Sequence, residues 1–128
     1  MLANVPDRDA VDAWEAVVLN ALTGEDRAAH AVYSGGEVHP GGRTVEVSGL
    51  ALSATADFLV AFVDESPGGN WAHACRYLVA TRAGVERSAE AGWPPVVGRL
   101  PPPWRLLHRG RSVEEWQLLP LATAPTVR

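Results

Sequence analysis

Three side chains that can do chemistry together lie close to one another near the middle of the chain. Asn70, His73 and Cys75 occur in the stretch SPGGNWAHACRY, and Cys75 is the single cysteine. A thiolate is a strong nucleophile, a nearby imidazole lowers the pKa of its thiol, and an amide can orient the imidazole. Alternate residues of a strand share a face, so His73 and Cys75 are neighbours if the stretch is extended. The pattern is compatible with a small cysteine-dependent hydrolase or transferase, with Cys75 as nucleophile, His73 as base and Asn70 as orienting residue.

The same stretch also fits an ordinary strand of a hydrophobic core. A buried cysteine behaves as a small apolar residue, and the local signatures that surround most nucleophilic cysteines are absent. In this interpretation the aromatic residues on either side pack with Cys75. His73 then forms a hydrogen bond with a backbone carbonyl or with a carboxylate such as Asp57 or Asp64. We favour this core interpretation over catalysis.

No metal site and no cofactor is expected. His73 and Cys75 would form half of a metal site, and His30, His39 or His108 would have to complete it. These residues lack the spacing of a recognised ligand motif. The glycine-rich stretch YSGGEVHPGG lacks the lysine of a phosphate-binding loop and the glycine spacing of a dinucleotide-binding motif.

Aromatic, proline and arginine residues form a second set of candidates. The chain has five tryptophans in 128 residues, and five of its ten prolines fall in the stretch WPPVVGRLPPPW. Tryptophan and proline on a surface form grooves for an extended peptide or another subunit, and they can equally pin a connecting segment to the core. The candidate binding residues are Trp71, Arg76, Tyr77, Trp93, Trp104, Arg105 and Trp116. They predict a non-catalytic accessory module that binds a peptide or a protein, and we expect this function ahead of the cysteine-dependent enzyme. A subunit that works only inside a larger complex is a third interpretation.

The composition indicates a single globular domain. The chain is 47% hydrophobic and 20% charged, which is typical of folded proteins, and its length fits one domain. One cysteine excludes an intramolecular disulfide and fits a reducing compartment. No secretory signal is visible, and no uncharged apolar stretch reaches the roughly 18 residues of a membrane span. We therefore expect a cytoplasmic protein; its 11 basic residues are all arginine, which suggests a GC-rich bacterial genome.

The charge is unevenly distributed along the chain. Residues 1–65 carry a net charge of −8 and residues 66–128 carry +4, which gives −4 in all. The two halves either attract each other within one fold, which we expect, or steer a partner. The arginines within residues 99–111 flank a tryptophan, a combination seen in proteins that bind single-stranded nucleic acids. The acidic pI of about 5.5 and the missing nucleic-acid motif argue against that ligand.

Residues 7–34 predict one or two helices. One apolar stripe with the helical period is formed by Val11, Trp14, Val18 and Leu22. Asp7 or Asp9 is suited to cap the first helix. Thr23 and Asp26 resemble the capping pair of a second, shorter helix that ends at the following glycines.

Residues 43–91 change to an alternating pattern and predict a β-meander. A first strand lies within residues 44–52. Residues 58–63 are apolar on both faces, so this strand should be central and covered on both sides. Residues 71–81 and 85–91 predict two further strands, joined by short turns.

Residues 92–128 form a segment rich in proline and tryptophan. Proline removes backbone donors, so residues 104–110 predict at most an edge strand. Residues 112–120 predict either a short helix with a Ser112–Glu115 capping box or the second arm of a hairpin. The last residues are expected to be a loose tail.

The order of these elements predicts an α+β fold. Residues 1–128 form a single domain in which one or two N-terminal helices pack on a mainly antiparallel sheet of about four to six strands. The Pro-rich C-terminal segment covers a sheet edge or reaches a partner, which allows a homodimer. The expected partners are a peptide, a protein or a second copy of the chain, and neither a membrane nor a nucleic acid.

Overall fold

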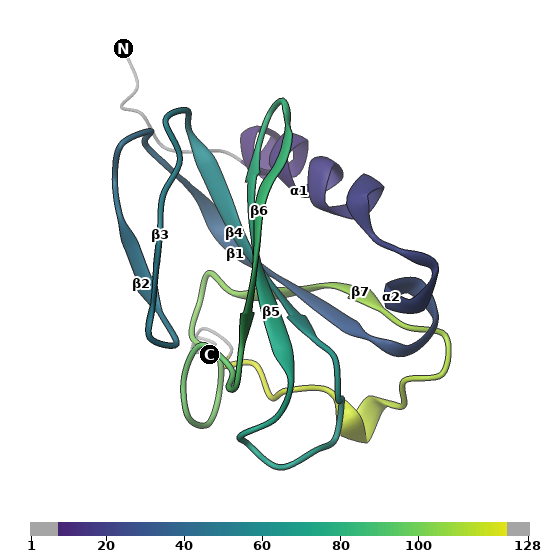
Figure 1. Cartoon of the computed structure of the whole chain (residues 1–128). Coiled ribbons are helices and arrows are strands. Elements are labelled where there is room, and N and C mark those ends of the chain that lie inside the picture. The colour runs from purple at the N-terminus through teal and green to yellow at the C-terminus, as the bar shows by residue number, and fades with distance from the viewer. Residues whose placement is uncertain (1–7, 123–128) are drawn as a thin grey trace, which may run out of the picture.

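The computed structural model describes residues 8–122, and these residues form an α+β fold. The elements in chain order are α1 (Arg8–Ala21), α2 (Gly24–Ala29), β1 (Ala31–His39), β2 (Val45–Val47), β3 (Leu50–Leu52), β4 (Phe58–Asp64), β5 (Cys75–Thr81), β6 (Gly84–Ala91), β7 (Arg105–Arg109) and the 3-10 helix η1 (Glu115–Gln117). Five strands form one antiparallel sheet in the order β6-β5-β4-β1-β7, and β2 and β3 form a separate two-stranded sheet. Figure 1 shows the helices and the β2–β3 hairpin on different sides of the larger sheet. The predicted fold class is confirmed.

The middle strand of the sheet is β4, and every one of its residues is buried. One face of β4 contributes Phe58, Val60 and Phe62 to a core, and the other contributes Leu59, Ala61 and Val63 to a second core. A strand that is apolar on both faces needs cover on both. The prediction that this strand is central and doubly covered is confirmed.

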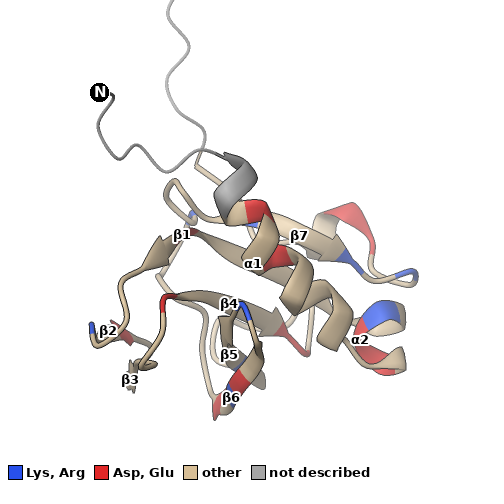
Figure 2. Ribbon diagram, turned by 90° about the horizontal axis from the view of Figure 1, so that it is seen from above, with Lys and Arg blue, Asp and Glu red and all other residues tan. Residues whose placement is uncertain are grey.

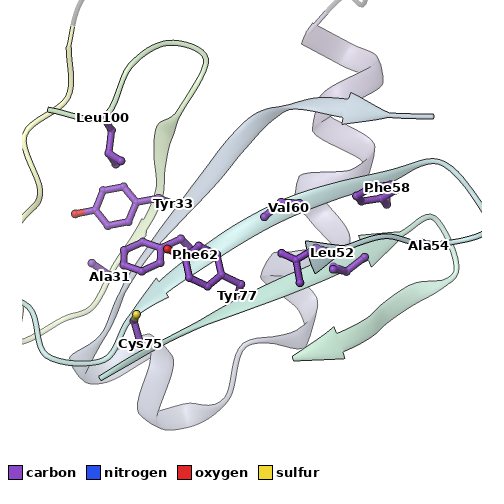
Figure 3. Packing of buried hydrophobic residues seen from close by; sticks show 11 residues of the cluster. Ala31, Tyr33, Leu52, Ala54, Phe58, Val60, Phe62, Cys75, Tyr77 and Leu100 are labelled. Carbon is purple, nitrogen blue, oxygen red and sulfur yellow. The ribbon is translucent and has the colours of Figure 1, made fainter. Parts of the chain in front are cut away.

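The two cores lie on opposite faces of the sheet. The smaller core lies under α1 and buries Val11, Val18 and Leu22 of the predicted helical stripe. The larger core lies on the face covered by the β2–β3 hairpin and the C-terminal segment. In it the rings of Tyr33, Phe62 and Tyr77 pack side by side (Figure 3). This second face also carries the candidate site.

The helical segment is shorter than the sequence predicts. α2 ends at Ala29 and β1 begins at Ala31, so the prediction of helix up to residue 34 is wrong. β1 pairs with β4 on one side and β7 on the other, and residues 31–34 are buried. Burial between two strands outweighs the weak helical pattern of this segment.

The helix caps are confirmed only for α2. Thr23 and Asp26 form the predicted capping box, with each side chain accepting the other's backbone N–H. The predicted cap Asp7 lies outside the described residues, and Asp9 lies inside α1. Acidic residues in the first turn of α2 suit the positive end of the helix dipole.

The first predicted strand of the meander is in fact a hairpin. Ser48 and Gly49 turn the chain between β2 and β3 with φ values of 53° and 77°. A two-residue turn with positive φ at both positions matches the twist of a hairpin. The expectation of one continuous strand over residues 44–52 is therefore wrong. The meander proper consists of β4, β5 and β6.

The C-terminal segment crosses the face opposite α1. β7 forms the predicted edge strand beside β1, and the 3-10 helix η1 supports the short-helix alternative. Its capping pair is Glu114 and Gln117, so the predicted Ser112–Glu115 box is wrong. Leu100 and Leu121 form an isolated bridge that closes the segment over the core. The predicted tail lies mostly outside the described residues.

Ion pairs join the acidic first half of the chain to the more basic second half. Arg105 of β7 binds Asp12 and Glu15 of α1, and Arg76 of β5 binds Asp26 of α2. Figure 2 shows the acidic positions of α1 close to β7. These contacts support the expectation that the charge asymmetry acts within the fold. No helix of residues 8–122 is both long and apolar enough to cross a lipid bilayer.

Candidate binding site

Cys75 is the first residue of β5 and is buried at one end of the larger core (Figure 3). Its Sγ lies 3.3 Å from the carbonyl oxygen of Trp93 and 3.5 Å from that of Ala91. Burial, and then the nearby carboxylates of Asp64 and Glu65, raise the pKa of the Cys75 thiol to about 11. The thiol is therefore protonated at neutral pH, whereas a nucleophilic cysteine needs the thiolate.

The imidazole of His73 is bound to partners other than the Cys75 thiol. Its Nε2 lies 2.8 Å from Oδ1 of Asp64, and its Nδ1 contacts the backbone carbonyl oxygen of Asn70. β5 begins only at Cys75, so His73 lies in the preceding loop and not on the predicted strand face. The structure places His73 against a carboxylate, as the core interpretation predicts. The group of Asn70 that contacts the imidazole is its backbone carbonyl, and not the side-chain amide that the catalytic interpretation requires.

Asp64 ends β4 and is completely buried. Its Oδ1 also accepts the backbone N–H of Ser66 at 3.0 Å, whereas Oδ2 has no hydrogen-bond partner within residues 8–122. Burial raises the pKa of Asp64, although Ser66 and His73 act against the rise. Because the Asn70 carbonyl and the Asp64 carboxylate are both acceptors, the Asp64–His73 contact has to hold a proton between Oδ1 and Nε2. The pair ties the loop between β4 and β5 to the end of the sheet.

Two of the predicted binding residues hold elements of the fold together. The Tyr77 ring is completely buried, and its hydroxyl donates to the carbonyl oxygen of Trp93 at 2.9 Å. The Arg105 guanidinium donates to the carboxylates of Asp12 and Glu15 on α1. Both side chains therefore form hydrogen bonds within the molecule.

Arg76, a third predicted binding residue, lies in a charged network beneath α2. Its guanidinium is 2.6 Å from Oδ2 of Asp26 and 2.8 Å from Oε2 of Glu65. Burial alone would raise the pKa of Asp26, but hydrogen bonds from Arg76, the Thr23 N–H and His30 outweigh it and hold that pKa well below its usual range. A hollow of about 460 Å³ opens beside the network. Its buried charges already satisfy one another, so it offers less for a ligand than the face described next.

Trp71 and Trp93 form a stacked pair on the surface. Their ring centroids are 5.8 Å apart and their planes are 4° from parallel, and each residue is 43% exposed. The Trp71 indole N–H donates to the carbonyl oxygen of Val96 at 3.3 Å. The backbone of Trp93 is fixed by the thiol, the Tyr77 hydroxyl and the hydroxyl of Ser48, which all lie within 3.3 Å of its carbonyl oxygen. The pair is thus an exposed apolar platform on a rigid support.

Trp116, in η1, is the most exposed tryptophan of the described chain at 72%. Its ring lies against the loop at Gly68, where an added Cβ would be 3.1 Å from a ring atom. It does not line the groove described below.

A groove of about 230 Å³ lies on the face opposite α1, next to the stacked pair. β1 and β2 form two of its walls, and the prolines that precede β7 form another. Trp104 lines this groove and passes over Gly35, where an added Cβ would lie 3.9 Å from its ring and 2.8 Å from the carbonyl oxygen of Val60. Pro95 and Val96 connect the groove to the stacked pair. Of the predicted binding residues, Trp71, Trp93 and Trp104 are thereby brought to one face.

Three polar residues line the groove, and only one of them, His39, was a candidate from the sequence, and only as a possible metal ligand. Glu37 and His39 of β1 and Glu46 of β2 all line the groove. Burial lowers the pKa of His39, with Arg43 acting in the same direction and Glu37 against it, so His39 is neutral at neutral pH. The turn at Ser48 and Gly49 was a signal that could have been read, because a two-residue turn between alternating segments is typical of a hairpin. The approach of that hairpin to β1 has no local signature.

Within residues 8–122, no group of three or more His, Cys, Asp or Glu side chains is arranged to hold a metal ion. Comparisons with protein-family models, curated protein sequences and solved structures gave no match. Fold and site together define an α+β domain with an aromatic groove on one face of its sheet.

Proposed function

We propose that the protein is a non-catalytic accessory module that binds an extended segment of a partner protein. The binding surface consists of the stacked Trp71–Trp93 pair and the adjoining groove at Trp104. The observation that carries the proposal is the stacked pair itself, because two tryptophans lie exposed and both are held in place. The backbone carbonyl of Trp93 accepts three hydrogen bonds, and the indole N–H of Trp71 donates to Val96.

Tryptophan is the residue type that most often dominates binding energy in protein interfaces. A rigid aromatic platform binds with little loss of conformational freedom, which favours affinity. Grooves lined by aromatic side chains are also typical sites for extended peptides. These general properties support a peptide or protein as ligand.

The cysteine-dependent enzyme has no comparable support. Its nucleophile would be a thiol with a raised pKa, and its base is occupied by Asp64. We place the module in the bacterial cytoplasm, since a free, buried cysteine is compatible with a reducing compartment. A second copy of the chain is an alternative occupant of the same surface.

The test is selection from a displayed library of random peptides against the wild-type protein, the Trp71→Ala/Trp93→Ala variant and the Trp116→Ala variant. We expect enriched peptides to bind the wild type and Trp116→Ala alike, and to lose about tenfold or more in affinity for the double variant. Trp116→Ala is the matched control, because it removes an even more exposed indole outside the groove. No enrichment on the wild type, or equal binding by all three proteins, would overturn the proposal. Sedimentation of the free protein separates self-association from peptide binding.

A further inference from the structure

The groove is bordered by an open strand edge. β2 pairs with β3 along one edge only, and none of the strands described in residues 8–122 pairs with the other edge. All three residues of β2, Val45, Glu46 and Val47, line the groove. The groove therefore offers main-chain hydrogen-bonding groups as well as side chains.

The hairpin turn determines which backbone groups face outward. In a hairpin with a two-residue turn, the residues that flank the turn form a hydrogen-bonded pair, and such pairs alternate with non-hydrogen-bonded pairs. Val47 and Leu50 flank the turn, so Glu46 and Ala51 form the next, non-hydrogen-bonded pair. The N–H and C=O of Glu46 are then directed away from β3, toward the open edge.

The side chains of β2 alternate in the same way. Val45 and Val47 pack against the larger core, whereas the Glu46 side chain is exposed. A strand added beside β2 would follow this alternation. Its residue opposite Glu46 would lie on the outer side, and the residues before and after it would point inward, toward Trp104 and the prolines.

The charge of the groove is negative. Glu37 and Glu46 line it, no arginine lines it, and His39 is neutral at neutral pH. Arg43 is the nearby cation, close enough to act on His39. A carboxylate directly opposite a basic residue on a neighbouring strand is a favourable cross-strand pair.

We infer that the ligand is an extended segment with the pattern apolar–basic–apolar that adds as a strand to the open edge of β2. The basic side chain pairs with Glu46, with Glu37 as a second carboxylate of the same groove, and the apolar side chains pack against Trp104 and the proline wall. This inference rests on the proposed function, and it specifies the chemistry and the geometry of the ligand.

The test uses two capped peptides of about seven residues, one alternating valine with lysine and one alternating valine with glutamate. Each is titrated into the ¹⁵N-labelled protein and followed by amide and indole shifts. The lysine peptide is expected to shift β2, residues 35–39 and the Trp104 indole, and to bind more tightly than the glutamate peptide. Glu46→Gln is expected to weaken binding about two- to fivefold. Glu86→Gln, on the outer edge of the sheet in β6, is the matched control and leaves affinity unchanged.

The inference is overturned if both peptides bind equally, or if the shifts map to β6 instead of β2. It is also overturned if the library peptides bind through Trp71 and Trp93 but show no basic residue and no loss with Glu46→Gln. That last result leaves the proposed function intact. If neither library peptides nor the lysine peptide bind, both proposals fail together.

Discussion

Asp64 and Cys75 are directly paired residues of β4 and β5, so a buried carboxylate lies beside a buried thiol. The negative charge of Asp64 disfavours the thiolate of Cys75. The imidazole of His73, which would favour the thiolate, contacts Asp64 instead. The side chains of Asp64, His73 and Cys75 thus lie in one corner of the fold, in an arrangement that makes the sulfur less nucleophilic, and Asn70 contributes only its backbone carbonyl there.

The first prediction is that Cys75 is inert in the folded protein. Its reaction with iodoacetamide should be slow between about pH 5 and pH 9, because burial and the carboxylate keep the thiol protonated. His73→Ala should not slow it further under conditions in which both proteins are folded. The urea-unfolded chain, which exposes the same thiol, is the control and should react at the rate of a free cysteine. Rapid alkylation at low pH that disappears in His73→Ala would restore the cysteine-dependent enzyme as the leading hypothesis.

The second prediction concerns the pH dependence of stability through Asp26. Its pKa is lowered in the folded state, so its contribution is fully present above the unfolded value of 3.8. It is then lost as the pH falls through the folded pKa. Asp26→Asn should reduce the free energy of unfolding near neutral pH by about 3 kcal/mol, since it breaks a buried ion pair with Arg76. This difference from the wild type should shrink as the pH falls below about 4.

Urea denaturation at neutral and acidic pH measures this difference. Glu25→Gln, an exposed change in the same helical turn, should alter stability by less than about 0.5 kcal/mol at both pH values. A loss for Asp26→Asn that stays constant down to acidic pH would show that its charge is not the source of the stabilisation.

The fold could be predicted where one segment carried a strong pattern by itself. Residues 58–63 are apolar at every position, which is enough to identify a central strand. Residues 31–34 are too short and mixed for such a pattern, and only their position between β4 and β7 makes them a strand. Local propensity was outweighed there by long-range pairing.

The site could be predicted only in part for a related reason. Trp71, Trp93 and Trp104 were recognisable as candidate binding residues from their type, and Trp93 and Trp104 also from their proline neighbours. Arg76 and Tyr77 were candidates on the same grounds. Their side chains instead form hydrogen bonds within the molecule, with Asp26 and Trp93, and these partners are distant in the sequence. Glu46 shows no local signal, because its proposed role depends on which edge of a hairpin stays open.

The third prediction tests the floor of the groove with Gly35→Ala. A methyl group at this position would lie 2.8 Å from the backbone oxygen of Val60 and 3.9 Å from the Trp104 ring. The Val60 backbone cannot move away without disturbing the sheet, so the variant should lose about 1–3 kcal/mol of stability. It should also weaken peptide binding, because the strand must shift toward the groove.

Gly24→Ala is the control for this change, since nothing lies within 4 Å of an added Cβ there. It should change the free energy of unfolding by less than about 0.5 kcal/mol. Thermal or urea unfolding measures both variants. Equal stability of the two would mean that the sheet yields easily beneath Trp104, and the groove would then not be preformed.

The fourth prediction separates folding from binding at the stacked pair. Trp71 and Trp93 are each 43% exposed, and an aromatic pair adds about 0.5–1.5 kcal/mol beyond its buried area. A double-mutant cycle of Trp71→Ala and Trp93→Ala, measured by urea denaturation, should therefore give a coupling energy no larger than that. The double variant should remain folded and yet bind the selected peptides about tenfold or more weakly. A pair kept only for the fold would give the reverse result, with a large coupling energy and unchanged peptide affinity.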